Sequence, residues 1–143
     1  MHLAQINIAK MLEPIDSTLL ADFVAQLDEI NALGEASEGF VWRFKDETGN
    51  ATNVQPFANP MIIVNMTVWE SVESLKNFTY KSDHVRVFRE RRKWFDPNFD
   101  LPNLAMWWIE EGHIPTLEEA QSKIYQLHEF GASEEVFTFR EVM

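Results

Sequence analysis

The stretch from residue 61 to residue 69 (MIIVNMTVW) constrains the fold more than any other part of the sequence. Alternate residues of a β-strand face opposite sides of a sheet. One face of this stretch carries only Ile, Val and Met, and the other carries Asn65 and Thr67 among apolar neighbours. A sheet with one solvated face would alternate apolar with polar residues. We therefore expect both faces to be covered. Helices of the same chain cover one face, and the other is covered most simply by the sheet of a second copy, or alternatively by a C-terminal helix that folds back.

Apolar residues recur with the period of strands (2 residues) or of helices (3.6 residues) in successive stretches of the chain. The order of these stretches is β-α-β-β-α-β, then α-β. The expected strands are residues 3–9, 40–44, 61–69, 104–110 and 136–140, and the expected helices are 17–30, 71–78, 83–95 and 116–130, with a long loop at 46–60. The first six elements match the split βαβ pattern of ferredoxin-like domains, if the two helical pieces between residues 71 and 95 count as one. We expect an α+β fold with an antiparallel sheet and a C-terminal helix-strand extension, forming one domain over residues 1–143.

Composition excludes several classes of protein. The net charge of −11 argues against binding to nucleic acid, whose phosphates attract basic surfaces. No apolar run approaches the roughly 18 residues that a membrane-spanning helix needs. Cysteine is absent, which removes disulfides and thiolate chemistry, and no two His residues have metal-ligand spacing. We expect a cytoplasmic protein with no membrane or nucleic-acid partner, no metal and no cofactor.

The basic run near the middle of the chain divides into two groups. Five of the 12 basic residues lie between residues 86 and 93. On a helix that turns by about 100° per residue, the solvated face carries Arg86, Arg89 and Lys93. His84 and Arg91 instead fall in the centre of an apolar arc, with Arg92 at its edge.

An inward guanidinium costs several kcal/mol unless it is paired, so Arg91 has two interpretations. It belongs either to a buried ion pair, with His84 as a core imidazole, or to a pocket walled by Phe88, Phe95 and strand aromatics. Arg binds carboxylates and other planar anions, and His transfers protons near neutral pH. We favour the pocket, with Arg91 and His84 as its catalytic residues.

Three further positions are weaker candidates for ligand contacts. Asn7 and Asn65 are polar positions that could share one sheet face or lie at its ends. Trp107 and Trp108 point to opposite faces of their strand, so that one can line a pocket while the other packs at an interface; we assign Trp107 to the pocket. His113 is expected to be a loop residue.

Two resemblances follow from short motifs. The segment TVWES at 67–71, with Phe78, Ser82–Asp83 and Gly39–Phe40, resembles the strand-helix segment of antibiotic-biosynthesis-type monooxygenases and their haem-degrading relatives. This resemblance covers about a third of the chain. It implies a dimeric αβ barrel with a pocket between sheet and helices.

A closer resemblance runs along nearly the whole chain, to a bacterial family catalogued as domain of unknown function 3291 and placed among the dimeric αβ barrels. The segments that carry it are LAQIN at 3–7, GFVWR at 39–43, WESVESL at 69–75, SDH at 82–84, RRKWF at 91–95, WWI at 107–109 and GHIPT at 112–116. It implies the fold and the homodimer and supplies no substrate.

The haem-degrading relatives use an Asn on the first strand, a Trp in a helical turn and a haem-binding His. Asn7 matches the Asn, whereas Phe78 stands at the Trp position. The His position falls near Phe88 or Arg89, more than a turn after His84. Two of the three positions depart from the pattern, so the resemblance does not carry haem chemistry to this chain.

These observations predict a homodimer with a small-molecule pocket, in the form of a cofactor-independent monooxygenase-like enzyme that acts on an anionic or enol/aromatic ligand. The alternatives are a binding module without catalysis and, less favoured, a haem-binding protein. The expected ligand-binding residues are Asn7, Asn65, Phe78, Phe88, Arg92, Phe95 and Trp107.

Overall fold

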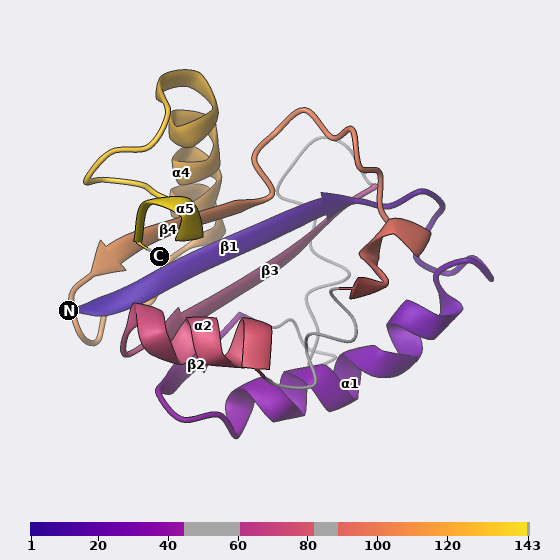
Figure 1. Cartoon of the computed structure of the whole chain (residues 1–143), viewed down its shortest axis with the longest axis horizontal. Helices are drawn as coiled ribbons and strands as arrows, with labels where there is room; N and C mark the ends of the chain where they lie inside the picture. The colour runs from indigo at the N-terminus through magenta and orange to yellow at the C-terminus, as the bar shows by residue number, and fades with distance from the viewer. Residues whose placement is uncertain (45–60, 82–88, 143) are drawn as a thin grey trace.

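The computed structural model describes residues 1–44, 61–81 and 89–142 of the 143-residue chain. Its strands are β1 (His2–Lys10), β2 (Phe40–Arg43), β3 (Ile62–Trp69) and β4 (Leu104–Ile109). Its helices are α1 (Ala21–Glu35), α2 (Val72–Lys81), α4 (Leu117–Phe130), α5 (Phe139–Val142) and the short 3₁₀-helix η1 (Arg91–Lys93). The described residues thus form a mixed α+β fold with a four-stranded antiparallel sheet and four α-helices (Figure 1).

The sheet has the strand order β2-β3-β1-β4, so β1 and β3 are the two central strands. Their antiparallel register places Gln5 opposite Thr67 and Asn7 opposite Asn65. Because side chains of a strand alternate between faces, these four polar side chains lie on the same face of the sheet.

The two faces are covered by different helices. One face, which we call the α4 face, packs Ile6, Met66 and Trp107 against the buried residues of α4. The opposite face, which we call the α1–α2 face, packs Leu3 and Trp69 against α2 and the segment leading into α5. In Figure 1, α2 and α5 lie in front of the sheet and α4 lies behind it.

The expectation that β3 is covered on both faces is confirmed within a single chain. Ile62 and Val64 are only 6% exposed on the α4 face, and Thr67 and Trp69 are buried on the other. The cover of the α4 face includes α4 itself, which is the alternative and not the partner sheet that we expected. Burial of β3 therefore does not require a second copy of the chain.

Local signals explain where two of the helices begin and end. Thr116 Oγ1 accepts a hydrogen bond from the backbone N–H of Glu119 at 3.1 Å, which caps α4. Gly131 adopts a φ of 80° directly after α4 and ends it. Ser71 Oγ accepts from the backbone N–H of Ser74 at 3.1 Å at the start of α2. These caps confirm the predicted start of α2 and both predicted ends of α4, whereas α2 continues to Lys81, beyond the predicted end at residue 78.

Helix α1 begins four residues later than the sequence predicts. The expected start at residue 17 is a turn, in which Ser17 Oγ accepts from the backbone N–H of Leu20 at 3.4 Å. The helix itself begins at Ala21. Leu19, which the helical spacing placed on the apolar face, is consequently exposed.

The predicted fifth strand at 136–140 is wrong. Only Phe137 pairs with β4, through two backbone hydrogen bonds to Met106 of 2.8 and 2.9 Å. The chain then turns into α5, because Thr138 and Glu141 form a capping box. The Thr138 N–H donates to Glu141 Oε1 at 2.9 Å, and Thr138 Oγ1 accepts from the backbone N–H of Arg140 at 3.1 Å.

The predicted helix at 83–95 is also corrected. Residues 82–88 lie outside the described part, as does the loop predicted at 46–60. After Arg89, a turn at Glu90 leads into η1, and Phe95 already pairs with Met11 beyond the end of β1. A continuous helical phase therefore does not extend across this segment, and Arg91, which that phase placed inside an apolar arc, is exposed.

Candidate functional site

A cavity of about 360 Å³ lies on the α1–α2 face of the sheet. Its floor is formed by the central strands β1 and β3, and its walls come from α1 and α2. Residues of η1, α5 and the chain before β4 contribute to its edge. Most of the described lining is apolar, so the few polar side chains decide which ligands the cavity can orient.

Three of the polar residues of the floor, Gln5, Asn65 and Thr67, form one hydrogen-bonded network. Gln5 Nε2 donates to Thr67 Oγ1 at 2.7 Å and to Asn65 Oδ1 at 3.0 Å. Trp69 Nε1 also donates to Thr67 Oγ1, at 2.8 Å. Gln5 is only 3% exposed, and a buried polar group left without a partner costs about 1–3 kcal/mol. The network is the reason why polar side chains are tolerated at the centre of the sheet.

Aromatic rings close one end of the cavity. The Phe78 ring stacks on Trp69, with 5.3 Å between ring centroids, and Phe40 meets Trp69 edge-on at 5.7 Å. Gly34 of α1 lies against the Phe78 ring, so that a Cβ at this position would be 3.4 Å from Phe78 Cζ. Gly34 of α1 therefore lies in close contact with the Phe78 ring of α2 at this end of the cavity.

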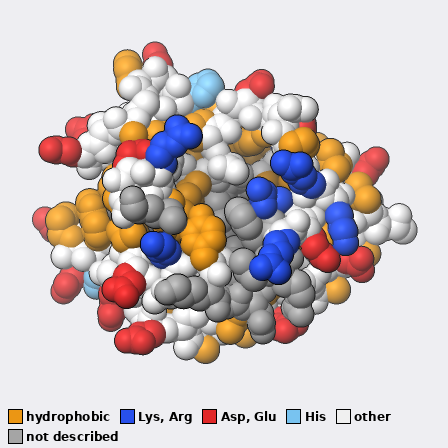
Figure 2. All heavy atoms as spheres, in the orientation of Figure 1, with side chains coloured by type: hydrophobic (Ala, Val, Ile, Leu, Met, Phe, Trp, Pro, Cys, Tyr) orange, Lys and Arg blue, Asp and Glu red, His pale blue; other side chains and the backbone are white. Residues whose placement is uncertain are grey.

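Two arginines contribute to the lining. Arg43 of β2 is largely buried and forms an ion pair with Glu35, with 2.8 Å between Arg43 Nη2 and Glu35 Oε1. Arg91 of η1 is exposed at the edge of the cavity, and Figure 2 shows basic side chains gathered over this segment. Among the described lining residues there is no Asp, Glu or His. The described lining therefore offers hydrogen bonds and positive charge, and no carboxylate or imidazole.

Several of the predicted site residues lie around this cavity. The structure brings together Asn7, Asn65, Phe78, Phe95 and Arg91 in its lining. They come from β1, β3, α2, η1 and the segment just after η1, elements that are far apart in the sequence.

The other predicted site residues are not brought to the cavity or fall outside the described part. His84 and Phe88 lie outside the described residues. Arg92 is exposed and does not line the cavity. Trp107 and Trp108 point to opposite faces, as expected, but Trp107 is buried on the α4 face. Trp107 therefore cannot contact a ligand in this cavity, because its side chain lies on the opposite face of the sheet.

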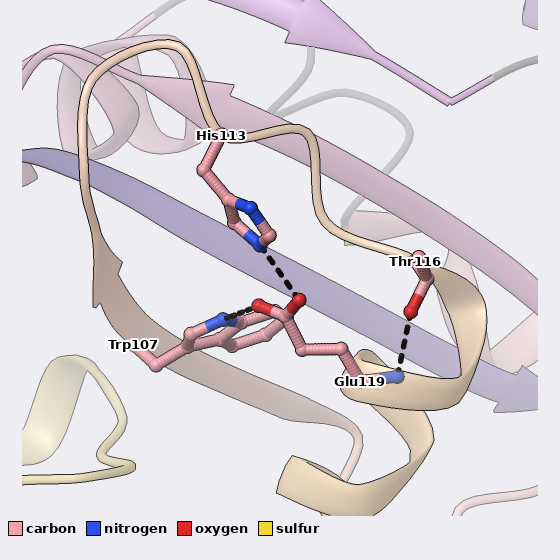
Figure 3. Close-up of polar contacts among 4 residues, drawn as sticks. All are labelled: Trp107, His113, Thr116 and Glu119. Atoms are coloured by element: carbon pink, nitrogen blue, oxygen red, sulfur yellow. Dashed lines mark hydrogen bonds and ion pairs between the residues drawn. The ribbon is translucent and has the colours of Figure 1, made fainter.

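A second polar cluster lies on the α4 face (Figure 3). Glu119 Oε2 accepts from Trp107 Nε1 at 2.8 Å, and Glu119 Oε1 lies 2.8 Å from His113 Nε2. Burial raises the pKa of the Glu119 carboxyl. The hydrogen bonds from His113 and Trp107, with the charges of His113 and Lys123, outweigh burial and hold that pKa below its usual value of 4.5. This cluster fastens the loop after β4 to the start of α4.

Sequence reasoning missed Gln5, Thr67 and Arg43. A signal for the first two was present, since Gln5 and Asn7 share one face of the first strand and Asn65 and Thr67 share one face of the third. Only the register of β1 with β3 shows that the two pairs meet. Arg43 gave no signal, because its place beside Thr67 depends on the pairing of β2 with β3.

Residues 2–143 match the family model described as Domain of unknown function (DUF3291). The chain belongs to this family. The cavity, its polar floor and the two arginines are therefore features of one member of DUF3291. No curated protein matches the chain.

Two solved structures resemble this DUF3291 member. The NE2512 protein of unknown function from Nitrosomonas europaea is 14% identical, with a TM-score of 0.51, and the match covers 80% of this chain and 95% of that one. PA3566 from Pseudomonas aeruginosa is 11% identical, with a TM-score of 0.48, over 73% of this chain and 88% of that one. At such low identity, the likeness to NE2512 concerns the fold alone.

The described residues contain neither a helix fit to span a membrane nor a cluster of metal-binding side chains. None of the helices in residues 1–44, 61–81 and 89–142 has the length and apolar character needed to cross a membrane. Within the same ranges, no group of three or more His, Cys, Asp or Glu side chains is arranged to hold a metal ion.

Proposed function

We propose that this protein binds a small molecule with a flat, largely apolar body in the cavity on the α1–α2 face. The observation that carries the proposal is a cavity of about 360 Å³ with apolar walls over a buried polar floor. Ligand sites in proteins are typically about 300–1,000 Å³ and combine apolar walls with a few placed polar groups. The half-buried Phe78, which stacks on the fully buried Trp69, supplies a flat surface against which an aromatic body can stack.

The finer features of the fold belong to this proposal. The strand order β2-β3-β1-β4, with α1 and α2 on one face, supports a ferredoxin-like arrangement. The motif resemblance to antibiotic-biosynthesis-type monooxygenases supports a dimeric αβ barrel, a fold in which a pocket lies between sheet and helices. The position of the cavity is consistent with this arrangement.

Binding is tested by filling the cavity. Ala9 of β1 lines it, whereas Ala32 of α1 is exposed and does not. We expect Ala9→Phe to weaken the binding of planar aromatic probes at least about tenfold, because the new ring occupies the ligand's space. Ala32→Phe, the matched control, should leave affinity unchanged. Isothermal titration calorimetry measures both, and equal affinities in the two variants would place the probes elsewhere.

Catalysis is a separate arm of the proposal. A cofactor-independent monooxygenase needs a base to remove a proton from its substrate before oxygen reacts, and His84 is the residue we propose for this role. Incubation with a panel of quinols and enolisable aromatics, while oxygen uptake is recorded, tests this activity. Uptake that depends on the substrate supports the enzyme, whereas binding without uptake supports a binding module.

A further inference from the structure

We infer that Gln5 and Asn65 select ligands by one kind of polar edge, a carbonyl oxygen beside an N–H or O–H donor. Lactams, imides and enolised diketones share this edge. The inference rests on the proposed function and names the chemical class that the cavity would take.

The amide oxygen of Gln5 faces the cavity. Both hydrogens of its amide nitrogen are used, on Asn65 Oδ1 and Thr67 Oγ1. No hydrogen bond to Gln5 Oε1 occurs among the described residues. In the same part of the chain, no side-chain oxygen or nitrogen that is fully buried lacks a partner. Gln5 Oε1 therefore reaches the open space of the cavity and is available as an acceptor.

Asn65 offers the complementary group, a hydrogen-bond donor. Its Oδ1 accepts from Gln5, so its amide nitrogen keeps its hydrogens for another partner. The cavity thus meets one acceptor on Gln5 and one donor on Asn65. Exchange of oxygen and nitrogen in both amides preserves the network and again leaves one acceptor and one donor, with the two residues in swapped roles.

A carboxylate fits this floor less well than a neutral edge does. A carboxylate only accepts hydrogen bonds, so one of its oxygens would lie against the amide oxygen of the floor. The cation nearest to this floor along β2, Arg43, already forms an ion pair with Glu35. A neutral edge with one donor and one acceptor matches both amides at once, and the floor discriminates against partners that lack either.

The test compares two planar probes of the same shape. In 2-quinolinone the ring carbonyl stands beside an N–H, and in coumarin the same carbonyl stands beside a ring oxygen. We expect the unaltered protein to bind 2-quinolinone at least about tenfold more tightly than coumarin, by isothermal titration calorimetry. We also expect 2-naphthoate, which carries a carboxylate, to bind more weakly than 2-quinolinone.

Failure of this inference is distinguishable from failure of the proposed function. Equal affinities for 2-quinolinone and coumarin, or tightest binding of 2-naphthoate, would overturn the selected edge and leave cavity binding intact. No binding of any planar probe, naphthalene included, would overturn both. These measurements use the unaltered chain, so they do not depend on whether a variant folds.

A variant then assigns the effect to the floor. Gln5→Leu removes the acceptor, and the preference for 2-quinolinone over coumarin should fall to about one. Gln121 of α4 does not line the cavity, so Gln121→Leu should keep the full preference. In the unaltered protein, the side-chain amide resonances of Gln5 and Asn65 should shift with 2-quinolinone. If these resonances stay in place while the probe binds, the assignment to these two residues is wrong.

Discussion

Glu119 is the residue on which the loop after β4 and the first turn of α4 both depend. Its carboxylate accepts from the buried Trp107 and contacts His113. Its pKa is lowered, so at pH values between the native pKa and the usual value of 4.5 the unfolded state binds more protons at this site than the native state does. The stabilisation by Glu119 is therefore complete above the usual pKa of 4.5 and is lost as the pH falls through the native pKa.

The first prediction follows from this dependence of stability on pH. Glu119→Gln should lower the free energy of unfolding by about 1 kcal/mol at neutral pH, because one charge-assisted contact is lost. The deficit should shrink as the pH falls through the lowered native pKa of Glu119, since a protonated Glu resembles Gln. Urea denaturation at several pH values measures it. Glu118→Gln is the control, because the exposed Glu118 shares the first turn of α4 and its dipole. Identical profiles for both variants would contradict the role of Glu119.

The second prediction concerns Thr67, whose hydroxyl oxygen accepts from both Gln5 and Trp69. Thr67→Val keeps the shape and the strand propensity and removes the acceptor. We expect a loss of about 2 kcal/mol in urea denaturation, because two donors near the sheet centre lose a shared partner. Thr18→Val, at an exposed position before α1, should change stability by less than about 0.5 kcal/mol. A comparable loss in both variants would argue against the network.

At the scale of elements, α5 depends on its cap. It spans only four residues, Phe139–Val142, and Phe139 lines the cavity and packs against Tyr80 with 5.4 Å between ring centroids. A helix this short has little stability of its own, so the capping box and the packing of Phe139 hold it in place.

The third prediction tests that cap. Thr138→Ala should cost about 1 kcal/mol and speed hydrogen exchange in residues 139–142, because the first helical N–H groups lose their acceptor. Thr138→Ser keeps the hydroxyl and should exchange almost as slowly as the unaltered protein. Equal exchange in the Ala and Ser variants would show that packing alone maintains α5.

Elements with local signals at both ends were predictable from the sequence. The helix from Thr116 to Gly131 carries its cap and its stop signal within the segment, and β1 and β3 carry clear alternation. The strand expected at 136–140 failed because Val136, Phe137 and Phe139 also suit a buried turn and helix start. The box formed by Thr138 and Glu141 was the signal that decided this segment and was overlooked.

Only part of the cavity was predictable, because it depends on contacts between distant segments and not on local signals. Asn7 and Asn65 were recognised as polar positions within apolar strands, but which neighbours they meet depends on register, which is a property of the pairing. Arg91 was assigned to the inside from a uniform helical phase. The 3₁₀ turn at Arg91–Lys93 breaks that phase, and Arg91 reaches the edge of the cavity from an exposed position.

At the scale of the whole molecule, the homodimer stays a prediction. Its original reason was that β3 is apolar on both faces. Within one chain, α4 helps to cover the face for which we expected a partner sheet. The resemblance to dimeric αβ barrels is the reason that remains. We expect light scattering at micromolar concentration to give twice the mass of one chain, and a monomeric mass would remove the prediction.

The polar floor of the cavity lies on the two central strands of the sheet. Gln5 and Asn65 stand on β1 and β3, each hydrogen-bonded to a neighbour on both sides, whereas the opposite walls are helices and short turns. Doubly paired central strands are usually among the last parts of a fold to open, so the floor holds a fixed pattern of donors and acceptors. The walls can repack around bodies of different outline. Such a site is strict about one functional group and permissive about the rest of the molecule, and changes in α1 or α2 should alter which bodies fit while the accepted group stays the same.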